Sequence, residues 1–178
     1  IMPNQFGMIV SGSNTEIGKA DLANGNVICG NSVVGIEIAL GSGNKVQHNL
    51  IGTTFDGRTD AGNGQGITIG GSDNNIIGGD NWDDGNVISG NSVYGIIISG
   101  APPDSYSADN ARGITITNAT MSTQIIDNII SGNTNEGIYI FGYDDETYTN
   151  GHIIHGNSIG TDGTQGSFPN EGEGILIA

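Results

Sequence analysis

Carboxylates and aromatic rings gather in two polar turns of this sequence. The first reads GGDNWDD from Gly78 and places a Trp among acids; the second reads FGYDDETYTN from Phe141. A ring in a polar turn can stack on the apolar face of a sugar while neighbouring carboxylates accept hydrogen bonds from its hydroxyls. These residue types favour a carbohydrate-binding surface. The candidate contacts, which include two tyrosines and one acid from the repeats described below, are Trp82, Tyr94, Tyr139, Tyr143, Tyr148, Asp144, Asp145 and Glu37.

The same acidic turns offer oxygen ligands for a calcium ion. Ca²⁺ takes roughly six to eight oxygens, which carboxylates and backbone carbonyls can supply. Neither turn matches an EF-hand loop or a nonapeptide calcium repeat. Calcium is thus the one cofactor that the sequence leaves open, and no other is expected. Its ligands would come from Asp80, Asp83 and Asp84, or from Asp144 and Asp145.

Catalytic residues are harder to find. A polysaccharide lyase needs a strong base, and the candidates are Arg58 in a DGRTD turn and Arg112 just before an apolar run. A hydrolase needs two carboxylates held at a set separation, whereas most acids here lie in turns. The sequence therefore favours binding without catalysis, and a lyase or hydrolase remains the alternative.

A repeated Gly-apolar-x-apolar run must position these residues. Its alternation places both apolar residues on one face of a strand and the middle residue on the other face. The middle residues therefore form an outward row, which is Ile9, Glu37, Thr68, Ile97, Thr115, Tyr139 and Leu176. The runs begin at Gly7, Gly35, Gly66, Gly95, Gly113, Gly137 and Gly174.

Two further short strands follow most of these runs, separated by Gly and Asn turns. The second strand is expected to begin at Asn14, Asn44, Asn74, Gln124 and His152, and the third, together with its leading asparagine, at Asn26, Asn49, Asn86, Asn128 and Asn157. No helical period is present, and such repeats bury their Ile faces only by stacking. We predict one all-β domain over 1–178, a right-handed parallel β-helix of about six or seven coils with three strands each. An irregular insertion is expected at 99–112, either as a short coil or as a projecting loop.

One asparagine precedes the third strand in each coil. Asn adopts the left-handed conformation readily, and stacked Asn amides hydrogen-bond along a column. We expect a structural ladder of Asn26, Asn49, Asn86, Asn128 and Asn157.

The composition narrows the partners. The chain has 32 Gly and a formal charge of -15, from four basic and nineteen acidic residues. Nucleic acid and anionic membranes are not expected as partners, because both require clustered Lys and Arg. Cys29 is the only cysteine, so an internal disulfide cannot form.

Four phrases carry a resemblance to a known family: GNVICGN at Gly25, HNLIGTTFDGRT at His48, GNVISGN at Gly85 and GNSIGTDGT at Gly156. The chain resembles secreted bacterial right-handed parallel β-helix proteins of the pectate-lyase-like superfamily. The resemblance implies an extracellular bacterial protein that works on polysaccharides. Some similar rods are carbohydrate-binding modules of plant-cell-wall hydrolases, so we expect this chain to be part of a longer protein with a catalytic or surface domain.

Residues and resemblance together predict a non-catalytic carbohydrate-binding module for a plant-cell-wall polysaccharide, with xylan as the first candidate. The alternatives are a β-helix lyase or glycoside hydrolase, and a passive surface stalk or adhesin module.

Overall fold

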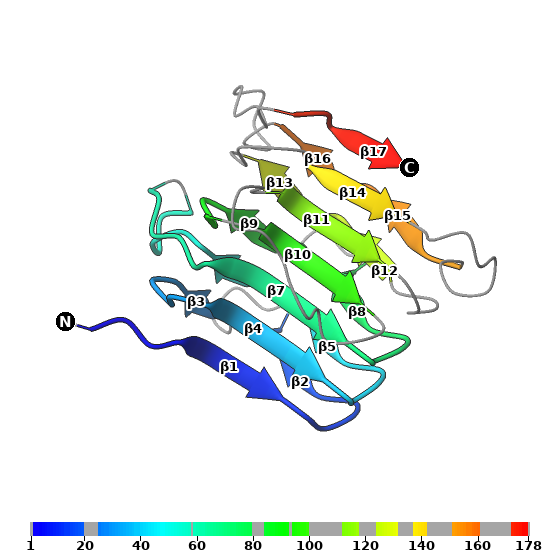
Figure 1. The fold of residues 1–178 in the computed structure, drawn as a ribbon, viewed down its shortest axis with the longest axis horizontal. Coiled ribbons are helices and arrows are strands. Elements are labelled where there is room, and N and C mark those ends of the chain that lie inside the picture. Colours follow the sequence, from blue (N-terminus) through cyan, green and yellow to red (C-terminus); the bar gives the residue numbers. More distant parts are fainter. Residues whose placement is uncertain are drawn as a thin grey trace.

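The chain folds into three stacked parallel sheets. A computed structural model describes residues 2–19, 25–57, 59–79, 84–92, 94–99, 112–117, 124–131, 137–141, 151–160 and 172–177. The chain passes from the seven-stranded sheet A to the five-stranded sheets B and C and back again (Figure 1). Every pair of neighbouring strands is parallel, which confirms the predicted parallel β-helix.

The strands follow the predicted repeat. Sheet A contains β1 (Phe6–Val10), β4 (Val34–Ala39), β7 (Gln65–Gly70), β10 (Tyr94–Ser99), β11 (Arg112–Thr117), β14 (Ile138–Phe141) and β17 (Ile175–Ile177). Sheet B contains β2 (Glu16–Ile17), β5 (Lys45–Val46), β8 (Ile76–Gly78), β12 (Gln124–Ile126) and β15 (Ile153–His155). Sheet C contains β3 (Val27–Ile28), β6 (Leu50–Ile51), β9 (Val87–Ser89), β13 (Ile129–Ser131) and β16 (Ser158–Ile159).

Aliphatic columns fill the inside of the stack. In sheet A, Ile36, Ile67 and Ile96 pair in register on β4, β7 and β10, and all three are fully buried. Ile77 of sheet B and Ile88 of sheet C close the same interior. Burying one such side chain stabilises a protein by roughly 1.5–3 kcal/mol, so stacking supplies the main stabilisation of each coil.

The predicted asparagine ladder runs along the corner between sheets B and C. The Asn49 amide nitrogen donates to Oδ1 of Asn86 at 3.0 Å, and the Asn86 amide donates to Oδ1 of Asn128 at 3.0 Å. The same Oδ1 atoms also accept the backbone N–H of the preceding rung. Asn26 and Asn157 extend the ladder at either end, as predicted.

Two more ladders, which the sequence analysis did not predict, occupy the other corners. Asn31 donates to Asn63 at 2.8 Å and Asn63 donates to Asn91 at 3.0 Å between sheets C and A. Asn44 donates to Asn75 at 3.1 Å between sheets A and B. All five of these asparagines are buried. Buried amides therefore fix the register between coils at every corner.

The segment between β10 and β11 breaks the three-sheet cycle. These two strands are direct neighbours in sheet A, while β8 pairs with β12 and β9 pairs with β13. Among the described strands, none lies between the members of those pairs. Ser99 ends β10 and Arg112 begins β11, at the two bounds predicted for the insertion. Residues 100–111 lie outside the described residues.

Asn86→Ala should destabilise the fold strongly. Asn86 is buried, and its loss removes the acceptor of two Asn49 donors and the donor to the Val46 carbonyl. Each buried group left without a partner costs about 1–3 kcal/mol, so we expect a loss of about 3 kcal/mol or more in the free energy of unfolding. Urea titration followed by circular dichroism measures this loss.

Asn26→Ala is the matched control for that substitution. Asn26 is only half-buried, and its side chain donates to Asn49 at one end of the described ladder. The expected loss is about 1 kcal/mol. Equal losses for the two variants would contradict a ladder whose stabilisation comes from burial.

Candidate functional site

The outward row of sheet A has the register that the sequence predicts. Glu37 pairs with Ile9 and Thr68, Thr68 with Ile97, Ile97 with Thr115, and Thr115 with Tyr139. Glu37 and Thr68 are half-buried between fully buried isoleucines, as expected for positions that alternate with the core. Sheet A thus aligns one acid, two threonines and a tyrosine position along the rod.

A second row lies beside the first on sheet A. Val34, which is buried, pairs with Gln65, Gln65 pairs with Tyr94, and Tyr94 pairs with Arg112. The Thr68 hydroxyl donates to Oε1 of Gln65 at 2.8 Å, so these two side chains share one face of the sheet. Their hydrogen bond joins the Thr68 hydroxyl, which belongs to the row that contains Glu37, to the Gln65 amide beside that row.

Sheet A brings together three of the predicted contact residues. Glu37, Tyr94 and Tyr139 lie on β4, β10 and β14, and in each case two strand spacings separate them along the sheet. Adjacent strands are about 4.8 Å apart, so each step is about 10 Å along the rod. Tyr94 also lies three residues before Ile97, the residue of β10 in the row of Glu37 and Tyr139, so it is displaced from that row by roughly a further 10 Å along the strand. The other predicted contacts lie outside the described residues: Trp82, Tyr143, Tyr148, Asp144 and Asp145.

The calcium ligands predicted in the first acidic turn are only partly described. Asp84 is 4% exposed, and its backbone carbonyl accepts the N–H of His48. Asp80 and Asp83 lie outside the described residues, as do the alternative ligands Asp144 and Asp145. The part of the chain that the structure describes contains no group of three or more His, Cys, Asp or Glu side chains placed to hold a metal ion.

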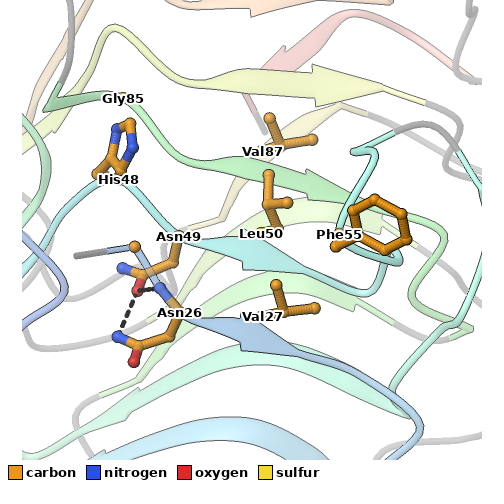
Figure 2. A pocket seen from close by; sticks show the side chains of 9 residues that line it. Asn26, Val27, His48, Asn49, Leu50, Phe55, Gly85 and Val87 are labelled. Atoms are coloured by element: carbon orange, nitrogen blue, oxygen red, sulfur yellow. Dashed lines mark hydrogen bonds between the residues drawn. The ribbon is translucent and has the colours of Figure 1, made fainter. Parts of the chain in front are cut away.

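A groove on the outer face of sheet C was not predicted. It has a volume of about 360 Å³, and its floor is formed by the outward residues of three consecutive strands, Val27, Leu50 and Val87 (Figure 2). Phe55 stands on one side of this floor and His48 on the other. The sequence signal was an apolar residue at the outward position of three third strands, where a solvent-facing strand normally carries a polar one.

A short hairpin between β6 and β7 positions Phe55. Thr53 and Asp60 form an antiparallel bridge, and the Thr54 N–H donates to the Thr59 carbonyl at 2.9 Å. The Asp56 carboxylate accepts hydrogen bonds from the Thr54 hydroxyl, the Thr59 hydroxyl and the Thr59 N–H at 2.7–2.9 Å. These bonds preorganise the hairpin, while the Phe55 side chain remains 85% exposed.

Glycines leave room at the His48 side of the groove. Gly25 and Gly85 occupy the equivalent corner positions one rung away on either side of His48. A Cβ at Gly25 would overlap the His48 carbonyl, and a Cβ at Gly85 would overlap the Asp127 carbonyl. The two positions therefore require glycine, and among the described lining residues the imidazole is the only large side chain at the Gly25 and Gly85 corner.

The described residues include few of the catalytic candidates. Glu37 is flanked in its row by Ile9 and Thr68, so the described part of that row holds no carboxylate pair on adjacent strands. Arg112 lies at the start of β11, and Arg58 is outside the described residues.

The described residues include no helix long and apolar enough to cross a membrane.

Comparison with known proteins identifies no relative. No protein-family model, no curated protein and no solved structure matches the chain.

Asp56→Ala should loosen the hairpin without unfolding the rod. The substitution removes the acceptor of the Thr59 N–H and of two hydroxyls, all in an exposed segment. Each such bond contributes about 0.5–1.5 kcal/mol, so hydrogen exchange of the Thr59 amide should become about tenfold faster or more. Exchange measured by NMR checks this expectation.

Asp56→Asn is the matched control because its amide keeps one oxygen acceptor for the Thr59 N–H. Its exchange rate should lie between those of wild type and Asp56→Ala. Unchanged exchange in Asp56→Ala would mean that the carboxylate does not hold the hairpin.

Proposed function

We propose that this chain is a non-catalytic carbohydrate-binding module whose ligand is a plant-cell-wall polysaccharide, with xylan as the first candidate. The observation that carries the proposal is the register of sheet A. It places Glu37, Thr68, Thr115 and Tyr139 in one row across parallel strands, with Tyr94 in the row beside it. An extended glycan needs a long surface of this kind, with hydroxyl-bonding groups at regular intervals.

The spacing of the rungs supports an extended ligand. Parallel strands repeat at about 4.8 Å, which is close to the length of one β-linked pyranose residue. A glycan that lies along the rod would therefore meet an equivalent position of the row at nearly every sugar. In this arrangement the Glu37 carboxylate accepts hydrogen bonds from hydroxyls, while the Gln65 amide can both donate and accept.

The charge of the chain favours a neutral glycan. At a formal charge of -15, a uronate-rich polymer would be repelled unless cations bridged it to the protein. An uncharged or weakly charged cell-wall polysaccharide carries no such penalty.

The resemblance to the pectate-lyase-like superfamily supports an extracellular bacterial protein in which this rod is joined to a catalytic or surface domain. The described strands fit the fold of that superfamily, and polysaccharides are its main ligands.

A lyase is the second candidate, because Arg112 pairs in register with Tyr94 and so begins its strand beside the row proposed to hold the glycan. An arginine at that place could act as the base that takes a sugar proton.

A passive stalk is the third candidate, and it needs nothing beyond the scaffold.

Affinity electrophoresis in gels that contain soluble polysaccharides, combined with product analysis, separates the three functions. We expect retardation in a xylan gel without unsaturated or reducing-end products, both with and without EDTA. Product formation would overturn the module in favour of an enzyme. Normal migration in every gel would favour the stalk.

Tyr139→Ala should weaken xylan retardation while leaving the circular dichroism spectrum unchanged. Loss of one stacking ring costs about 0.5–1.5 kcal/mol, which corresponds to a loss of affinity of up to about tenfold. Tyr139→Phe keeps the ring and should retain most of the binding. A Tyr139→Ala variant that fails to fold would assign this ring to the core.

A further inference from the structure

We infer that the groove on sheet C is a second carbohydrate subsite, which takes neutral pyranose units against Phe55 and the apolar floor. The inference rests on the proposed function and adds a second binding face to the one proposed on sheet A. The groove lies on β3, β6 and β9 of sheet C, whereas the rows that contain Glu37 and Tyr94 lie on sheet A. The corner that carries the Asn31, Asn63 and Asn91 ladder joins the two sheets.

The described lining of the groove is uncharged. None of the nine described residues that line it is an Asp, Glu, Lys or Arg, although the chain has nineteen acids. Among these nine residues a cationic ligand finds no carboxylate and an anionic ligand finds no basic group. The described lining is therefore complementary to an uncharged ligand.

The groove has an apolar floor and a polar side. The floor of Val27, Leu50 and Val87 is apolar, and the Phe55 ring stands beside it with most of its surface exposed. The opposite side carries the His48 imidazole and the Asn26 amide. A pyranose has the same division, because its axial C–H groups are apolar and its equatorial hydroxyls are polar.

The length of the groove floor also suits a glycan. Val27 and Val87 are two strand spacings apart, so the floor is about 10 Å long. This length suits two consecutive sugars of an extended chain. The hydrogen bonds of Asp56 hold the hairpin that carries Phe55, so little backbone entropy is lost on binding.

Two binding faces on one rod would make the module bivalent. Each face alone need bind only weakly, because simultaneous contact with neighbouring chains in a cell wall raises the effective affinity through local concentration. A short soluble oligosaccharide would instead occupy the two faces independently.

Calorimetric titration of the full chain with xylohexaose and cellohexaose tests the inference. We expect two equivalents per chain for wild type and one equivalent for Phe55→Ala. Phe55→Tyr keeps the ring and should retain two. Leu40→Ala removes an equally exposed side chain from the corner between sheets A and B and should also retain two. Oligogalacturonate, the charged probe, should not bind in the groove.

The outcomes separate this inference from the proposed function. Two equivalents in Phe55→Ala, or a single equivalent in wild type that Tyr139→Ala abolishes, would overturn the second subsite and leave the sheet A site intact. No binding by wild type would overturn both. If only the fluorescent apolar probe anilinonaphthalene sulfonate bound beside Phe55, the groove would be an apolar pocket and the inference would be wrong.

Discussion

The register between coils depends on buried asparagine amides. In the ladder from Asn26 to Asn157, each shared Oδ1 accepts both the side-chain amide and the backbone N–H of the preceding rung. The Asn86 and Asn128 amides also donate to strand carbonyls. A slip of one residue would leave several of these groups buried without partners, which is far more costly than the gain from any single bond. Because such ladders occupy all three corners, the coils can stack in only one way.

This constraint makes the outer faces available for function. Once the inward isoleucines and corner asparagines are set, the outward position of each strand can vary without disturbing the core. Sheet A uses this freedom for a mixed row with Glu37 and Thr68, whereas sheet C carries the apolar row of Val27, Leu50 and Val87. The two faces therefore differ in chemistry although the same stacking rule builds both.

A hairpin extends from the rod at the corner between sheets C and A. The hairpin from Thr53 to Asp60 leaves the rod after β6 and contacts sheet C again near Leu50, which a Cβ at Gly57 would touch. Its own hydrogen bonds through Asp56 hold it together, so it needs little from the core. A turn of this kind can place a ring over a face without altering the register of the coils.

Much of the fold was predictable because it is periodic. The Gly-apolar-x-apolar run marked all seven strands of sheet A, and the Asn before each third strand marked one full ladder. The outward row of sheet A followed from strand alternation alone, and its register is confirmed. The ladder of Asn31, Asn63 and Asn91 was missed although the sequence held a signal for it, because Asn31 and Asn91 both lie four residues before the glycine of a sheet A run and Asn63 lies three residues before one. The ladder of Asn44 and Asn75 was missed as well. The assignments to Trp82, Tyr143, Tyr148, Asp144 and Asp145 stay predictions.

The sequence by itself determined which residues face inward, because a repeat of this kind has only one way to bury its isoleucines. Only the tertiary structure decided that β10 and β11 are neighbours, since that pairing depends on strands on both sides of the insertion. It also decided that Phe55, Val27 and Val87, which come from three different coils, line one groove. Proximity across coils is set by backbone ladders and by the folding back of one hairpin. Neither gives a periodic pattern in the sequence.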